Sequence, residues 1–153
     1  MSQKPEDYNL PSDYTHVENP WGKSFYKVYG AMNYADAKAQ CESDRTFLAI
    51  PRSEAENDFL AGLIPNESIW IGINDIEREG IFVTVDGRRI PYTKWYVGEP
   101  SNYNHGADGD EDGVEIRQGS YQKTWNDQPV VWSEKFICSV DVAGWFRIFT
   151  LMM

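Results

Sequence analysis

The sequence has few cysteines, no long apolar run and no excess of basic residues. Lys and Arg number 14 against 24 Asp and Glu, which gives a formal net charge of −10. This balance argues against nucleic acid as a partner, because contacts to phosphate groups depend on Lys and Arg. A membrane-spanning helix needs about 18 consecutive apolar residues, and the sequence contains no such run.

Only two cysteines are present, Cys41 and Cys138. A structural zinc site is excluded, since no Cys-x-x-Cys pair or Cys/His cluster accompanies them. They are either two buried thiols or the ends of one disulfide. A bridge between them would close nearly the whole domain and contribute about 4–5 kcal/mol by loop entropy. The residues alone leave both possibilities open.

The N-terminal residues 1–5 contain no apolar segment of the kind found in signal peptides. The chain is therefore either cytosolic or a mature form that carries an added Met. Hydrophobic residues make up 41% of the 153 residues and aromatic residues 14%, which predicts one domain with a packed core.

Hydrophobic spacing predicts two helices followed by short antiparallel strands, an α+β domain. One helix starts at the N-cap Asn33 and buries Tyr34, Ala37 and Cys41. A second starts at the capping box Ser53–Glu56, buries Ala55, Phe59 and Leu63, and ends before Pro65. Expected strands cover residues 24–29, 69–73, 81–85, 114–116, 124–125 and 135–138. We divide the chain into an irregular extension (1–19), a domain (20–140) and an apolar tail (141–153).

Acidic and amide side chains crowd the segments between the later strands. Calcium takes six to eight oxygen ligands, and irregular loops can bring such oxygens together. The simpler alternative is that turns are rich in Asp, Asn and Gly for conformational reasons. An EF-hand is rejected, because Gly119 stands at the twelfth position, where a bidentate Glu is required. The side chains concerned are Asp75, Glu79, Glu99, Ser101, Asn102, Asp108, Asp110, Glu111, Asp112, Asn126 and Asp127.

Five short motifs stand in an order that resembles the C-type lectin domain family. They are Trp70-Ile71-Gly72-Ile73, Glu79-Gly80, Glu99-Pro100-Ser101, Trp125-Asn126-Asp127 and Phe136-Ile137-Cys138. The resemblance covers residues 24–140 and implies the C-type lectin fold, with a long irregular loop region that binds calcium. It also places Cys41 and Cys138 at the family's outer disulfide.

The resemblance implies a principal calcium ion that also binds vicinal hydroxyls of a sugar. Its ligands would be Glu99, Ser101, Glu111, Asn126 and Asp127, the last through both side chain and backbone carbonyl. In this family the peptide before Pro100 is usually cis, which would turn Glu99 and Ser101 toward one point. A second calcium is expected at Asp75, Glu79, Asn102 and Asp112.

Three departures from the family pattern bear on these expectations. Ser101 replaces the Asn of the mannose-type Glu-Pro-Asn motif, while Glu99 keeps the mannose-type acceptor. Gly113 and Val130 stand where the family has its inner disulfide, so we expect calcium to stabilise this region. The loop over 99–112 is about four residues longer, and Tyr103 and His105 on it are expected either to contact sugar or to be solvated.

The leading functional hypothesis is a secreted, calcium-dependent lectin for glycans of the mannose, fucose and N-acetylglucosamine type. It would act in adhesion or microbe recognition. The alternative is a lectin-like module that binds a protein or another surface. A hydrolase with paired carboxylates is disfavoured, because calcium ligation accounts for the carboxylates better. The apolar tail favours a homo-oligomer, since linked sites strengthen weak sugar binding. Asn66-Glu67-Ser68 is an N-glycosylation sequon.

Overall fold

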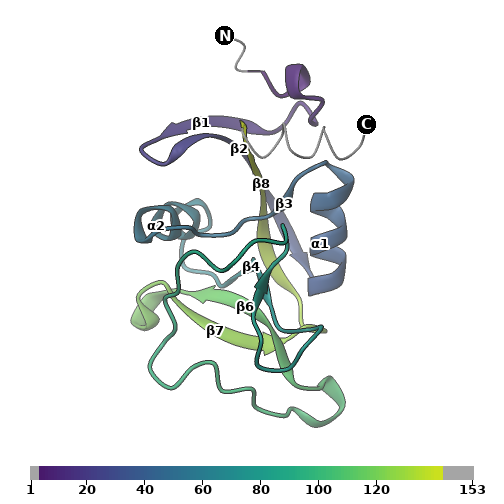
Figure 1. Ribbon diagram of the computed structural model, residues 1–153, viewed down its shortest axis with the longest axis vertical. Helices are drawn as coiled ribbons and strands as arrows, with labels where there is room; N and C mark the ends of the chain where they lie inside the picture. The colour runs from purple at the N-terminus through teal and green to yellow at the C-terminus, as the bar shows by residue number, and fades with distance from the viewer. Residues whose placement is uncertain (1–3, 143–153) are drawn as a thin grey trace.

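The computed structural model describes residues 4–142 of the chain (Figure 1). Two α-helices and eight strands make up its regular structure, together with three short 3-10 helices. The apolar tail predicted over residues 141–153 lies almost entirely outside the described part. None of the described helices is long and apolar enough to cross a membrane. The elements are η1 (Pro5–Tyr8), β1 (Thr15–Asn19), β2 (Gly22–Met32), α1 (Tyr34–Ser43), β3 (Phe47–Leu48), α2 (Glu54–Leu63), β4 (Ile69–Asn74), β5 (Val83–Thr84), η2 (Gly106–Asp108), β6 (Glu111–Arg117), η3 (Gly119–Tyr121), β7 (Thr124–Pro129) and β8 (Glu134–Asp141).

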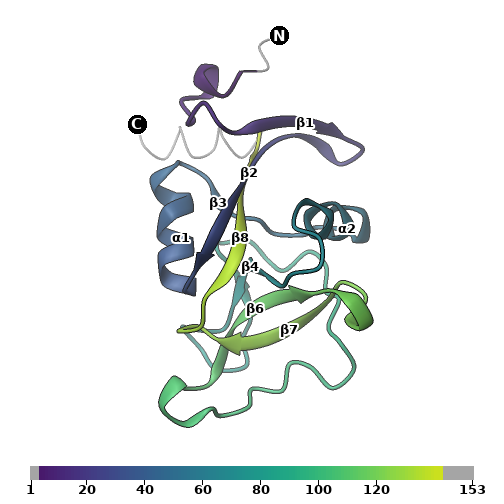
Figure 2. The same cartoon turned by 180° about the vertical axis from the view of Figure 1, so that it is seen from behind.

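The strands form one sheet in the order β1-β2-β8-β4-β6-β7, with β3 beside β8 and β5 beside β4. The predicted α+β class is confirmed. The expectation that all strands pair antiparallel is wrong at one point, because β4 and β8 run parallel, with Trp70 opposite Phe136. A parallel pair needs a long connection, and the chain supplies one through β5, β6 and β7. The helices α1 and α2 lie on opposite sides of the β2–β8 pair (Figures 1 and 2).

Helix α1 begins as its sequence predicts. The Asn33 side chain accepts a hydrogen bond from the backbone N–H of Asp36, and Tyr34, Ala37 and Cys41 are buried. The Tyr34 hydroxyl donates to the carbonyl oxygens of Ile71 (2.9 Å) and Ile73 (3.2 Å), which fixes α1 against β4. A disulfide between Cys41 and Cys138 joins the same helix to β8.

Helix α2 also begins at its predicted cap, where Ser53 accepts a hydrogen bond from the N–H of Glu56 (3.1 Å). Its predicted buried face is wrong at Ala55, whereas Phe59 and Leu63 are partly buried against the core. Ala55 is exposed, and the residues that are buried are Glu56, Asn57, Leu60 and Ala61. The helix is rotated because Asn57 is drawn inward, where its side chain accepts from the Trp125 ring N–H and donates to the Lys123 carbonyl.

The N-terminal extension is more regular than its sequence suggests. Thr15–Asn19 forms strand β1, which pairs antiparallel with β2, so the expectation of an irregular segment over 1–19 is wrong for these residues. Leu10 and Tyr14 are buried in the same core cluster as Phe25, which explains why this segment is ordered. The strand expected over 81–85 is shorter, and only Val83–Thr84 pairs with β4.

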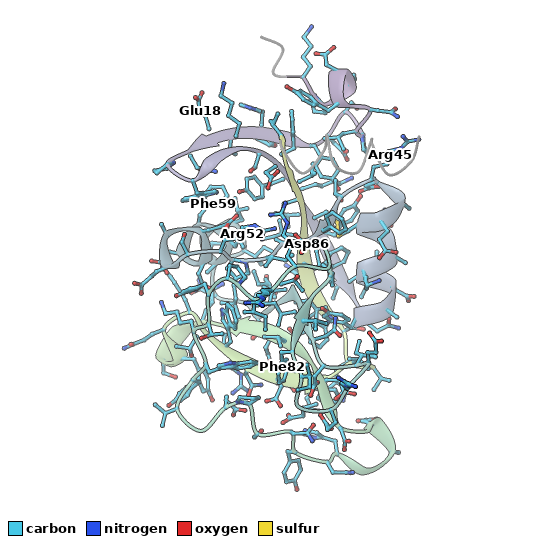
Figure 3. The ribbon with its side chains drawn as sticks, in the orientation of Figure 1. Glu18, Arg45, Arg52, Phe59, Phe82 and Asp86 are labelled. Atoms are coloured by element: carbon cyan, nitrogen blue, oxygen red, sulfur yellow. A yellow bond between two sulfur atoms is a disulfide. The ribbon has the colours of Figure 1, made fainter. Side chains whose placement is uncertain are left out.

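Polar contacts hold the middle of the molecule together. Figure 3 labels Arg52 and Asp86 near its centre, where the guanidinium donates to the carboxylate at 2.8 Å. The Asp86 side chain is almost fully buried, and the Arg52 guanidinium opposite lowers its pKa against the effect of burial. This ion pair joins the segment before α2 to the turn after β5, and the long irregular segment that follows leads to the far end of the molecule from β1 (Figure 1).

Candidate functional site

Two groups of carboxylates converge where β4 ends and β6 begins. The Glu99 cluster consists of Glu99, Glu111 and Asp127, and the Asp75 cluster of Asp75, Glu79 and Asp112. Within each cluster one oxygen from every carboxylate lies within 4.8 Å of the others. Strand pairing causes this convergence, since β6 lies between β4 and β7 and supplies one residue to each cluster.

Backbone amides hold the Glu99 cluster in place. The peptide between Glu99 and Pro100 is cis, as the sequence predicts. The N–H of Ser101 donates to Glu99 Oε1 (2.8 Å) and to Asp127 Oδ1 (3.0 Å). The next two N–H groups donate to Asp127 Oδ2 (Asn102, 2.7 Å) and to Glu111 Oε1 (Tyr103, 2.9 Å). Three consecutive amides thus orient all three carboxylates.

The side chain of Ser101 belongs to the Glu99 cluster. Its hydroxyl donates to Glu111 Oε1 at 2.7 Å. A hydroxyl can accept as well as donate, so its oxygen retains lone pairs for another ligand. The residue that departs from the family pattern therefore lies beside the carboxylates.

Asn102 connects the two clusters. Its backbone N–H donates to Asp127, and its side-chain Nδ2 donates to Glu79 Oε1 at 2.8 Å. Its φ of 49° is in the left-handed region, which Asn tolerates better than most residues. Asn102 thus stands among the residues predicted for the second ion.

The carboxylates of both clusters lie close enough to disturb one another's titration. Burial, and next the neighbouring Glu79, raises the pKa of Asp75 to about 8. Burial also raises the pKa of Asp112. Burial and the adjacent Asp127 carboxylate raise the pKa of Glu99. The hydrogen bond with Asp75 lowers the pKa of Glu79. Burial and the neighbouring carboxylates thus disfavour full ionisation of both clusters, which a bound cation would restore.

The donor set fits a hard divalent cation. Among residues 4–142 the lysine and arginine ion pairs involve none of the six carboxylates. Asp75 Oδ1 is buried and has no hydrogen-bond partner, an uncommon state for a carboxylate oxygen. Calcium prefers oxygen ligands of this kind. These residues could therefore hold calcium.

Asn126 lies next to Asp127 on β7 and is buried. Its Nδ2 donates to Glu115 Oε2 at 3.0 Å. Glu115 is also buried, and burial together with the Glu115 charge raises the pKa of the adjacent Glu134 to about 9. The bond to Glu115 occupies the amide N–H of Asn126 and leaves its oxygen as the atom suited to a cation.

An aromatic row continues from the Glu99 cluster toward solvent. His105 Nε2 lies 2.9 Å from Glu111 Oε2, and the His105 ring contacts Tyr103 (4.9 Å between centroids) and Trp132 (4.8 Å). Trp132 donates from its ring N–H to Asp108 Oδ2 at 2.9 Å. Tyr103 is 65% exposed. The longer loop is thus fastened to the β7–β8 turn with Tyr103 at its outer face.

Gly113 and Val130 are the positions at which the family resemblance places a second disulfide, which this chain has no cysteines to form. A Cβ on Gly113 would lie 2.9 Å from the Trp70 ring, so that ring fills the space there. The carbonyl of Val130 accepts a hydrogen bond from the N–H of Tyr34 at 3.0 Å. Packing therefore holds the backbone at Gly113, and one backbone hydrogen bond holds it at Val130.

The structure brings most of the predicted site residues together. Glu99, Ser101, Glu111 and Asp127 meet in one cluster, and Asn126 adjoins it through the backbone. Asp75, Glu79, Asn102 and Asp112 meet in the other. Sequence reasoning missed both Glu115 and Trp132. The contact between Glu115 and Asn126 could have been expected only from their position opposite each other in paired strands.

Comparison with known proteins defines the class to which this fold and site belong. The carbohydrate-recognition domain of the human scavenger receptor C-type lectin is 28% identical, covers 86% of this chain and 98% of that chain, and superposes with a TM-score of 0.72. The Kupffer cell C-type lectin receptor Clec4f, a trimeric structure, is 27% identical over 85% of this chain and 83% of that one, with a TM-score of 0.72.

Residues 30–140 match the family described as Lectin C-type domain, and the chain belongs to that family. Collectin-11 from Bos taurus is 35% identical over 123 residues, which cover 78% of this chain and 43% of collectin-11. The chain thus spans less than half the length of that relative. Domains of this family are non-enzymatic binding modules, so the chain is not an enzyme.

Proposed function

We propose that the chain is a calcium-dependent lectin that binds glycans of the mannose, fucose and N-acetylglucosamine type. The observation that carries this proposal is the convergence of Glu99, Glu111 and Asp127 beside the exposed segment 101–104. Family membership supports a lectin function, and the carboxylate clusters support the need for calcium.

The principal ion would be held by oxygens from the Glu99 cluster, Ser101 and Asn126. Asp127 would add its backbone carbonyl, which brings the protein ligands to about six and leaves two of calcium's six to eight positions for a sugar. Bound calcium would supply coordination to two vicinal hydroxyl oxygens. Glu99 and Glu111 would accept the hydroxyl protons in charge-assisted hydrogen bonds, which are the stronger kind.

The second ion would be held by the Asp75 cluster and Asn102. The orphaned oxygen of Asp75 and its raised pKa support this assignment, because a cation would replace the missing partner and stabilise the ionised form. We assign this ion a structural role, because Asn102 hydrogen-bonds both to Glu79 of the Asp75 cluster and to Asp127 of the Glu99 cluster. An ion at the Asp75 cluster would therefore help to fix Asp127.

Tyr103 and His105 would form a secondary sugar contact. The exposed Tyr103 ring can lie against the apolar face of a pyranose, and His105 fixes that ring relative to Glu111. Tyr103→Ala should then weaken glycan binding and leave calcium binding unchanged.

Secretion and self-association complete the proposal. The Cys41–Cys138 disulfide supports an oxidising compartment, and the match to collectin-11 is the second observation from which we infer secretion. The trimeric Clec4f structure supports a homo-oligomer, in which several weak sites would act together.

The decisive experiment is titration of the secreted protein with mannose in calcium and again in excess chelator, with galactose as the comparison sugar. We expect mannose to bind in calcium and not in excess chelator. Calcium binding without any sugar binding, on a glycan array as well, would favour the alternative, a lectin-like module whose partner is a protein or another surface. The Ser101→Asn variant then tests whether Ser101 is the reason that sugar does not bind.

A further inference from the structure

The single N-glycosylation sequon of the sequence lies in a turn with an exposed acceptor. Asn66-Glu67-Ser68 is the only Asn-x-Ser/Thr triplet in all 153 residues. It connects α2 to β4, where Asn66 is exposed and has a φ of 66°. Within residues 4–142 its side-chain amide has no hydrogen-bond partner, so the acceptor nitrogen is accessible.

The backbone around this acceptor is fixed. Gln118 Nε2 lies within hydrogen-bonding distance of one carbonyl oxygen in the last turn of α2, that of Ala61 (3.0 Å), and two in this connection, those of Ile64 (2.6 Å) and Glu67 (2.9 Å). The Glu67 side chain forms an ion pair with Lys135 at 2.6 Å. The turn thus presents a free amide from a well-anchored chain.

A pocket of about 290 Å³ opens beside the acceptor. Tyr121 lines it and is 37% exposed, and the Arg117 guanidinium lies 4.4 Å from the centre of the Tyr121 ring. The guanidinium lies over the ring and can donate to hydroxyl or acetamido oxygens of a sugar, and the part of the ring that Arg117 and Tyr96 leave exposed can contact sugar C–H groups. The other lining residues are Asn66, Glu67, Ser68, Gln118 and Gly119.

We propose that Asn66 carries an N-linked glycan whose first N-acetylglucosamine lies in this pocket. The amide nitrogen of Asn66 forms a bond to the anomeric carbon of the sugar and loses a proton. The bond between that carbon and the diphosphate of a polyprenol-linked donor breaks, and the diphosphate leaves. This inference rests on the proposed secretion, because the donor is met in the secretory pathway.

The glycan lies at the end of the strands opposite to the carboxylate clusters. Asn66 precedes the start of β4 and Asp75 follows its end, so a strand of six residues, about 20 Å, separates them. Likewise η3 lies on the α2 side and η2 on the α1 side of the β6–β7 pair (Figures 1 and 2). A glycan at Asn66 therefore leaves the sugar-binding face open.

Substitution of the sequon tests occupancy directly. The full chain is secreted from a eukaryotic host, and its intact mass is measured before and after peptide-N-glycosidase treatment. The mass of wild type and of Ser68→Thr should fall by one glycan on treatment, whereas the mass of Asn66→Gln and of Ser68→Ala should not change. Secreted wild type and Ser68→Thr that both carry no glycan would overturn the proposal.

The pocket is tested by the rate of native deglycosylation. Tyr121→Ala should release the glycan several-fold faster than wild type, while Tyr121→Phe, which keeps the ring, should match wild type. Equal rates in all three proteins would overturn the proposal that the first sugar contacts Tyr121.

Mannose titration of Asn66→Gln separates this inference from the proposed lectin function. We expect this variant to lose the glycan and to keep mannose binding. Either property can fail without the other.

Discussion

The half of the molecule built on α1, β2 and β8 is closed by apolar packing and a disulfide, whereas the half built on β6, β7 and the 98–110 segment is shaped by carboxylates. In the first half Tyr34, Cys41 and Phe136 are fully buried. In the second, Tyr103 is 65% exposed. The carboxylates there are oriented by backbone amides rather than by apolar neighbours.

The difference separates what stabilises the fold from what performs the function. Burial in the first half needs no ion, and its free energy is present at any calcium concentration. The second half gathers carboxylates whose mutual repulsion a bound cation would offset. Each of the predictions below changes one half and asks whether the other responds.

The largest effect is expected from removal of the disulfide. Cys41→Ser with Cys138→Ser releases a loop of 97 residues, which should lower the free energy of unfolding by about 4–5 kcal/mol. Urea denaturation measures this change. Calcium affinity of the folded variant should stay at the wild-type value, and a parallel loss of affinity would contradict the separation of the two halves.

Asp127→Asn should abolish binding at the Glu99 cluster. Asp127 is fully buried and receives the N–H groups of Ser101 and Asn102, so the variant loses a ligand charge and the anchor of that segment. We expect the calcium affinity measured by calorimetry to fall more than about 100-fold. This exceeds the loss that is typical when a residue that only hydrogen-bonds to a metal ligand is changed. Glu77→Gln, a change at an exposed neighbouring carboxylate, is the control and should bind as wild type.

Chelation should destabilise the domain although the disulfide stays intact. At calcium 100-fold above the dissociation constant, binding contributes about 2.7 kcal/mol. For a domain of this size that corresponds to roughly 5–10 °C in Tm. Differential scanning calorimetry with and without excess chelator measures the shift. An unchanged transition would show that packing at Gly113 and Val130 replaces the missing disulfide without help from calcium.

Short sequence motifs predicted the helix caps and the carboxylates that converge, and long-range packing decided what the motifs missed. Asn33 and Ser53 cap helices through bonds to residues three positions on, which the sequence shows directly. Ala55 has the right spacing for a buried face, but Asn57 binds Trp125, far along the chain, and rotates the helix. No local pattern contains that contact.

The same distinction holds within the site. Glu99 and Asp127 belong to short motifs whose order along the chain predicts their convergence. The contact of Glu115 with Asn126 depends on strand register, and that of Trp132 with Asp108 depends on the path of a long loop. Register and loop path follow from the whole fold, so these contacts could not be predicted from composition or spacing.

Glu115→Gln should weaken calcium binding about tenfold, at the lower end of the range for outer partners. The carboxylate that fixes the Asn126 amide becomes an amide, which can accept the same bond only in one orientation. Calorimetry with calcium measures the change. Glu134→Gln is the matched control: burial and the Glu115 charge raise the pKa of Glu134 to about 9, so glutamine resembles the protonated form present at pH 7.

The smallest effect concerns protons at the Asp75 cluster. Burial and Glu79 raise the pKa of Asp75 to about 8, above its ordinary value of 3.8, so without an ion the folded state holds a proton that the unfolded state releases. The ion-free domain should therefore lose stability as pH rises from about 4 to 8, while calcium must displace that proton to bind.

Calcium affinity should consequently rise about fivefold between pH 7 and pH 8, as the ionised fraction of a group with a pKa near 8 increases. Calorimetry in buffers of different ionisation enthalpy should also show proton release on binding at pH 7. Asp75→Asn has no such proton and should show neither effect. Proton release that persists in that variant would assign the titrating group to another carboxylate, and the Asp75 cluster would then not be the site where binding and protonation compete.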